Sequence, residues 1–253
     1  MPQTFWQWIV LLLDEYGSLF IKGTVNTMII AVSGTLIGFA IGLGVGVLRT
    51  VPVNKRDTPL KKALVKLMNF ILAAYVEIFR GTPMIVQSMV IYYGLFGSVN
   101  ISKMVAGVFI VSINTGSYMA EIVRGGILSV DYGQSEGALS IGMNHFQTMR
   151  YVVLPQAIRN IMPSIGNEFV VNIKDSSVLS VISVFELFFA GKSASGTYWR
   201  YFEVYTIIAV IYFILTFGVT RLLRLAERRM DGPGSFTVTG SQTDSRSVIK
   251  VKK

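Results

Sequence analysis

Residues 23–48 read GTVNTMIIAVSGTLIGFAIGLGVGVL and contain no charged side chain. A helix needs about 20 mostly apolar residues to cross a bilayer, so this stretch is long enough to span one. Charge is also absent from residues 81–102, 104–120 and 204–220. The sequence therefore predicts an all-α membrane protein that crosses the bilayer several times.

The composition of the whole chain agrees with this class: hydrophobic residues make up 52% and charged residues 15%. The net charge of +9 could suggest a nucleic-acid partner, but the basic residues gather in particular loops, as topology signals do. The chain has no cysteine, which excludes thiolate chemistry, and its one histidine, His145, leaves a histidine-based metal site or catalytic triad incomplete. We expect no nucleic-acid partner, no metal site and no catalytic residue.

The loop after residues 23–48 sets the orientation of the chain. Because loops rich in Lys and Arg stay on the cytoplasmic side, this loop is predicted to be cytoplasmic and the N-terminus external. Residues 1–21 are aromatic and acidic, and too short to span, so we expect an interfacial helix there. The loop contains one acidic residue, Asp57, and five basic residues: Arg49, Lys55, Arg56, Lys61 and Lys62.

Residues 60–98 would form a helix of about 57 Å, longer than the roughly 30 Å hydrocarbon core. Gly81 and Pro83 interrupt this stretch, so we expect one long, broken span that leaves the membrane near Asn100.

The remaining spans are expected over residues 103–123, 163–190 and 203–223, with a short external loop at 191–201. This gives five transmembrane helices, with the N-terminus out and the C-terminus in. Residues 22–229 then form the transmembrane domain. Residues 230–253 are rich in Gly, Ser, Thr and Lys, and are expected to be a disordered cytoplasmic tail.

Residues 131–155 read DYGQSEGALSIGMNHFQTMRYVVLP and form a polar interruption on the cytoplasmic side. The pairs Asp131–Gln134 and Asn144–Gln147 have the spacing of capping boxes, so two short helices with a break near Gly142 are predicted. Pro155 disfavours the α conformation of the residue before it and suits the start of the next helix. A capped helix with small residues, held between membrane spans, is suited to fit into a groove of another protein.

Glycines recur every four residues in the first span and so lie on one face of a helix, where they permit close approach of another backbone. This face could be a moving interface or ordinary helix packing. The four positions are Gly34, Gly38, Gly42 and Gly46.

Polar residues inside the spans are costly in a membrane and are therefore candidates for a polar path. Glu77 and Arg80 are three residues apart and can pair on one helix face, beside the helix break at Gly81–Pro83. The alternative is a structural ion-pair network that sets helix register. The candidates are Glu77, Arg80, Thr82, Gln87, Asn114, Tyr118, Glu121, Lys174 and Asp175.

The segment Glu186–Ser193 comes near to the phosphate-loop pattern, which has two glycines before a Lys and a Ser or Thr. Glu186 stands where the first glycine belongs, and the segment ends a membrane span rather than joining a strand to a helix. We therefore expect this chain to bind no ATP and no other cofactor by itself.

Residues 136–155 resemble the EAA loop of permease subunits of ABC importers. Glu136, Ala138, Gly142 and Pro155 match that pattern, and Gly137 replaces its middle alanine. Four further blocks resemble the polar amino-acid branch of this family: FRGTPMIVQ (79–87), YMAEIVRGGI (118–127), LPQAIRN (154–160) and NIKDSSVLSVI (172–182).

The resemblance implies a bacterial inner-membrane permease whose segment 127–155 docks on a separate ATPase subunit, the site of ATP and Mg. It also implies a second permease subunit, identical or related, an extracytoplasmic solute-binding protein, and a polar amino acid as substrate. Two alternatives remain at this point. One is an ion-gradient-driven secondary transporter or channel that uses Glu77, Glu121 or Asp175; the other is a membrane assembly factor.

Overall fold

The computed structural model describes residues 2–53 and 57–230, the last three by their backbone alone, and the regular structure of this part is helical throughout. Residues 231–253 of the expected tail lie outside the described residues. The α-helices are α1 (Phe5–Leu48), α2 (Pro59–Gly81), α3 (Met84–Leu95), α4 (Lys103–Leu128), α5 (Tyr132–Ser140), α6 (His145–Thr148), α7 (Leu154–Asp175), α8 (Leu187–Tyr198) and α9 (Tyr201–Met230). A π-helix, η1 (Met149–Val153), precedes α7, and a 3-10 helix, η2 (Ser176–Ile182), follows it.

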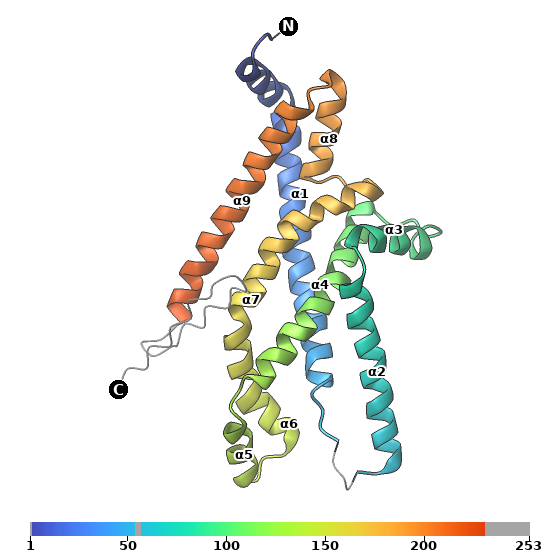
Figure 1. Cartoon of the computed structure of the whole chain (residues 1–253), viewed down its shortest axis with the longest axis vertical. Helices are drawn as coiled ribbons and strands as arrows, with labels where there is room; N and C mark the ends of the chain where they lie inside the picture. The colour runs from blue at the N-terminus through green and yellow to red at the C-terminus, as the bar shows by residue number, and fades with distance from the viewer. Residues whose placement is uncertain (1, 54–56, 231–253) are drawn as a thin grey trace.

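Within the described residues, α1, α4 and α9 are each long and apolar enough to cross a membrane. The segment from α6 to η2 and the helix α8 form a pair with a bend between them. If this pair is counted as one span, the number of candidate membrane spans rises from 3 to 4. The prediction of an all-helical membrane protein is confirmed. Figure 1 shows the N-terminus and α8 at one end of the molecule, and α5, α6 and the first turns of α2 at the other.

The first helix is longer than the sequence indicates. The interfacial helix expected over residues 1–21 is continuous with the first span, because α1 begins at Phe5 and ends at Leu48. Thr4 and Gln7 close a capping box at its start, and no proline interrupts it. Figure 1 shows the first turns of α1 inclined to the rest of the helix.

The predicted interruption between residues 60 and 98 is confirmed at Thr82 and Pro83, both of which have extended backbone conformations. Pro83 supplies no amide to α2 and directly precedes α3. Figure 1 shows α3 running across the end of α2 rather than continuing its direction.

The span expected over residues 163–190 is also broken. Helical structure runs from His145 to Ile182, and α8 then departs at 53°. Ser183 makes the bend with a left-handed conformation, φ 58°. The external loop expected at 191–201 is wrong, because α8 extends to Tyr198. Packing against α9 overrides the weak helix propensity of this Gly- and Ser-rich segment: a Cβ added to Gly191 would lie 2.8 Å from Ile208.

The glycine stripe of α1 lies against α4 of the same chain. A Cβ added to Gly38 would lie 2.7 Å from Thr115, and one added to Gly42 would lie 2.7 Å from the carbonyl carbon of Met119. Only glycine permits the two backbones to approach this closely. The stripe therefore packs α1 onto α4. This agrees with the second of the two alternatives, that these glycines serve ordinary helix packing.

Buried hydrogen bonds tie α7 to this pair of helices. Thr115 donates to the side-chain oxygen of Asn172 at 2.9 Å, and Asn172 donates to the hydroxyl of Thr35 at 2.8 Å. All three residues are almost completely buried. Because unpaired polar groups are costly inside a membrane, this chain of bonds fixes how α1, α4 and α7 pack together.

Candidate functional site

The short helix α5 projects at the end of the molecule opposite the N-terminus (Figure 1). The side chain of Asp131 accepts from the amide of Gly133 at 2.7 Å and so caps the helix. The reciprocal capping box expected with Gln134 is not formed, since the Gln134 amide donates to the Asp131 backbone carbonyl. At α6 the predicted box is confirmed: Asn144 and Gln147 exchange two bonds of 2.9 Å.

The predicted break between the two short helices falls at Gly142. Its φ is +90°, a conformation that residues with a Cβ rarely adopt. The amides of Gly142 and Met143 donate to the carbonyls of Leu139 and Ala138 and thereby close the end of α5. Glycine is therefore favoured at position 142 by the backbone conformation and not by a lack of space, since no atom lies within 4 Å of an added Cβ.

The expected docking residues do not all face outward. Glu136, Gly137 and Gly142 are exposed, and an added Cβ on Gly137 would meet no atom within 4 Å, so this position would also accept the alanine of the family pattern. Ala138 is buried, at 6% exposure, and packs into its own chain. Its small size is therefore required by internal packing.

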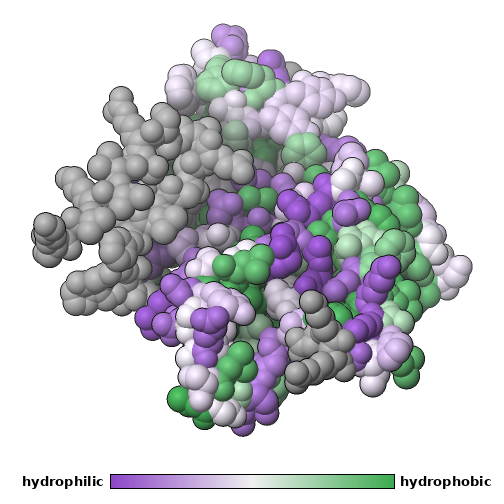
Figure 2. Space-filling model, turned by 60° about the horizontal axis from the view of Figure 1, so that its bottom comes forward, coloured by the Kyte–Doolittle hydropathy of each residue, from purple (hydrophilic) through white to green (hydrophobic). Residues whose placement is uncertain are grey.

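The sequence analysis overlooked a set of exposed apolar side chains around Glu136. Such residues are rarely so exposed on a polar segment unless they meet a partner. Figure 2, which brings this end of the molecule forward, shows apolar and polar surface side by side. The exposed fractions of these apolar side chains are 74% for Tyr132, 51% for Leu139, 78% for Ile141 and 71% for Phe146.

Pro155 is the second residue of α7, which confirms its place at the start of the next helix. Leu154 nevertheless has an α conformation, contrary to the expectation from the proline that follows it. The π-helical turn η1 precedes it directly, so α6, η1 and α7 form one continuous helical segment. The C-terminal part of the expected docking segment, α6, is thus joined to α7 without a loop, whereas residues 141–144 separate α5 from α6.

Three of the polar candidates form a closed hydrogen-bond network at the break between α2 and α3. Asn114 of α4 donates to the side-chain oxygen of Gln87 at 2.8 Å. The Gln87 amide in turn donates to the carbonyl of Phe79 and to both oxygens of Thr82, at 2.8–2.9 Å. These polar groups satisfy one another's hydrogen-bonding capacity. Their role in this structure is to fix the junction of α2 and α3 against α4.

Glu77 and Arg80 do not form the ion pair that their spacing allows; within the described residues Glu77 is exposed and has no ion-pair partner. The Arg80 guanidinium instead lies 5.5 Å from the ring centre of Tyr118. It also interacts electrostatically with Glu168 of α7, a half-buried carboxylate absent from the candidates predicted from the sequence, although the two do not form an ion pair.

Glu168 interacts electrostatically with both Asp175 and Arg80. The seven-residue spacing of Glu168 and Asp175 places them two turns apart on one face of α7, and this spacing was the signal that could have identified Glu168. One cation–π contact and longer-range electrostatic interactions thus link Arg80, Tyr118, Glu168 and Asp175 from three helices. Groups of both charges and an aromatic face can bind the amino and carboxylate groups of a zwitterion.

The two other charged candidates lie elsewhere. Glu121 forms ion pairs with Arg49 at the end of α1 and with Arg124, the latter at 2.9 Å, and so clamps α1 to α4. Lys174 lines a groove between α7 and α9. Glu121 therefore lies outside the cluster of Arg80 and Glu168, whereas Lys174 interacts electrostatically with Asp175 at its edge.

The segment that comes near to a phosphate loop has its anion-binding amides occupied. The completely buried carboxylate of Glu186 accepts from the amides of Phe188 and Phe189 at the start of α8, and from the hydroxyl of Tyr212. A helix start satisfied in this way offers no free amides to a phosphate. Within the described residues, no group of three or more His, Cys, Asp and Glu side chains could hold a metal ion.

Residues 61–232 match the family described as "Binding-protein-dependent transport system inner membrane component". The chain is 37% identical to the glutamine transport system permease protein GlnP of Escherichia coli K12, over 84% of this chain and 93% of that protein. It is 38% identical to the probable amino-acid permease protein YxeN of Bacillus subtilis 168, over 72% of this chain and 80% of that protein.

Two solved structures share the architecture. A chain of an amino acid ABC transporter, crystallised with histidines, superposes with a TM-score of 0.76 at 39% identity, covering 90% of this chain and 100% of that one. The inward-facing MetNI methionine ABC transporter gives a TM-score of 0.70 at 21% identity, covering 85% of this chain and 97% of that one. The second likeness concerns the fold alone.

Proposed function

Because this chain belongs to the family of inner membrane components of binding-protein-dependent transport systems, we propose that it imports a polar amino acid with energy from a separate ATPase subunit. It is a multi-pass protein of the inner membrane and a transport permease of the ABC type. The observation that carries the proposal is α5: an exposed carboxylate, Glu136, stands among exposed apolar side chains on a short helix that lies between α4 and the continuous α6–α7 segment.

In this proposal, segment 127–155 is the coupling element. Tyr132, Ile141 and Phe146 enter an apolar groove of the ATPase, while Glu136 makes the polar contact that depends on nucleotide state. Fully desolvated apolar anchors with one polar contact give both affinity and register to an interface. ATP and Mg bind to that partner and not to this chain.

We further propose five spans, with the N-terminus outside and the C-terminus in the cytoplasm. The α2–α3 pair and the α7–η2–α8 segment each count as one broken span, beside α1, α4 and α9. The basic residues between α1 and α2 and near the end of α9 support this orientation. Residues 22–229 then form the permease domain, which residues 230–253 follow in the cytoplasm.

The substrate path lies between this chain and a second permease subunit, identical or related, with a solute-binding protein delivering substrate at the outer face. Arg80, Tyr118, Glu168 and Asp175 are the groups proposed to contact the solute. Two carboxylates and one guanidinium favour a zwitterion such as glutamine, which the E. coli relative is named for. Alternating access then depends on this cluster having different contacts in two states.

The experiment is uptake into proteoliposomes that hold this chain, its ATPase and its binding protein. Glu136→Ala should abolish ATP-dependent uptake, whereas Gln134→Ala, also exposed on α5 but outside the coupling contact, should preserve it. Binding of the ATPase, measured separately by co-purification, distinguishes loss of docking from loss of coupling. Uptake that persists without ATP and follows an ion gradient would refute the importer proposal.

A further inference from the structure

A groove of about 280 Å³ runs between α7 and α9, away from the cluster of Arg80 and Glu168. Lys174 of α7 lines one side of it, and α9 supplies the other side. We call it the α9 groove. Its α9 residues include Phe213, Phe217, Thr220, Arg221 and Arg224.

The α9 groove is lined by Lys174, which interacts electrostatically with Asp175 of the same helix, and by two arginines of α9. Within the described residues, neither Arg221 nor Arg224 forms an ion pair, and both are exposed. The Arg221 guanidinium lies 4.9 Å from the ring centre of Phe217, which holds it beside the groove. Two guanidinium groups without an ion pair in the described part of the chain, on one side of the groove, form a site suited to a phosphate group. The Thr220 hydroxyl donates to the Thr216 carbonyl at 2.7 Å, so Thr220 lines the groove without donating to a ligand.

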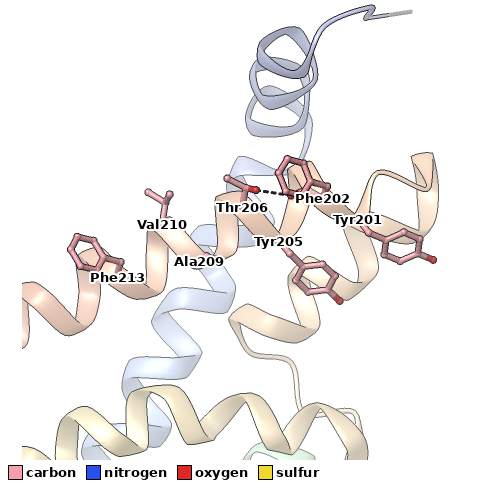
Figure 3. A pocket seen from close by; sticks show the side chains of 7 residues that line it. All are labelled: Tyr201, Phe202, Tyr205, Thr206, Ala209, Val210 and Phe213. Carbon is pink, nitrogen blue, oxygen red and sulfur yellow. Dashed lines mark hydrogen bonds between the residues drawn. The ribbon is translucent and has the colours of Figure 1, made fainter.

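The other end of the same helix face is apolar. Beyond Phe213 the face continues into a second hollow, whose lining side chains in Figure 3 all come from α9. Val210 and Phe213 are 51% and 65% exposed, as expected for lipid-facing residues. From Arg224 to Val210 the helix rises about 21 Å. That distance takes the face from one membrane surface to beyond the middle of a hydrocarbon core about 30 Å thick.

We propose that the α9 groove binds an anionic phospholipid of the leaflet nearest Arg221 and Arg224. The lipid phosphate contacts the two arginines, and an acyl chain lies along Phe217, Phe213 and Val210. A second copy of this chain is a poor occupant, because a two-fold interface centred here would bring the same cations toward one another. A free anion would leave the apolar half of the face unused.

The test measures lipid binding to the full-length, detergent-solubilised chain by native mass spectrometry. The probes are phosphatidylglycerol and phosphatidylcholine with the same sixteen-carbon chains, and glycerol 3-phosphate. Phosphatidylglycerol should bind most tightly, and the double variant Arg221→Gln/Arg224→Gln should weaken it about 30-fold, since each arginine near an anionic lipid contributes about fivefold. Arg159→Gln, an exposed arginine outside the groove, should leave the affinity unchanged.

Three results would overturn the proposal. One is an unchanged preference for phosphatidylglycerol in the double variant. Another is equal binding of glycerol 3-phosphate, which would assign the groove to a free phosphate. The third comes from Thr220→Cys in this cysteine-free chain: a disulfide between two copies would assign the groove to a second subunit. Each result is independent of whether the chain transports an amino acid.

Discussion

Helices α4 and α9 are both apolar enough to cross a membrane, but their surroundings differ sharply. In the most apolar part of each helix, 61% of the α4 residues are buried within the chain, against 11% for α9. The glycine stripe of α1 and the hydrogen bonds of Asn172 enclose α4. Helices α7, α8 and α1 pack against α9, and within the described residues most of its apolar stretch stays exposed.

This difference separates residues selected for internal packing from residues selected for external contacts. On α4, size and polarity must match the neighbours within the chain, so a substitution changes stability. On α9, the exposed residues meet lipid or another subunit, so a substitution there should change an interaction and leave the stability of the isolated chain almost unchanged.

The largest expected effect breaks the α1–α4 contact. In Gly42→Val the new side chain meets the backbone of Met119, which cannot move aside. The free energy of unfolding should fall by at least about 3 kcal/mol, measured by thermal unfolding in detergent. Gly44→Val is the matched control on the same helix, because no atom lies within 4 Å of its added Cβ. Equal losses in both variants would mean that the stripe does not pack as described.

A smaller effect is expected from the buried hydrogen bonds. Asn172→Leu removes both bonds to Thr35 and Thr115 and should reduce the unfolding free energy by about 1–2 kcal/mol. Asn160→Leu is the control, since its one side-chain bond, to Ser129, is exposed. If the Asn172→Leu variant is as stable as the parent chain, these hydrogen bonds do not fix the packing of α7 against α1 and α4.

The smallest effect is expected on α9. Ile214 is 62% exposed, so Ile214→Ala should alter the unfolding free energy of the solubilised chain by less than about 0.5 kcal/mol. The same truncation at Ile110 of α4, which is completely buried, should cost about 2–5 kcal/mol. Similar costs at the two positions, measured in the same unfolding assay, would contradict the contrast between the helices.

The sequence predicts the features that depend on local chemistry. Pro83 fixes the break between α2 and α3, Gly142 fixes the end of α5, and the absence of charge identifies α1, α4 and α9 as spans. Each of these follows from a backbone restriction or from the cost of charge in lipid. For the same reason, the sequence predicts two short helices with a break at Gly142 in the segment proposed to dock.

Features that depend on distant neighbours could not be predicted. Ala138 matches the docking pattern, but its burial depends on how α5 folds back on η1. Helix α8 forms in a segment of weak propensity because Glu186 caps it and α9 packs on Gly191. Glu77 and Arg80 have the spacing of a pair, yet Arg80 turns to Tyr118 and Glu168 on other helices.

The continuous helix from His145 to Ile182 has a mechanical consequence. It contains no coil residue, but Pro163 lies inside α7 between α6 and Glu168 and supplies no amide to the helix. Glu168 and Asp175 lie beyond Pro163 on one uninterrupted stretch of α7, so a tilt of that stretch moves both carboxylates together. The segment ends before Ser183, where the backbone leaves the helical conformation. We expect a displacement of α6 to reach these two carboxylates through Pro163, as a tilt of this stretch.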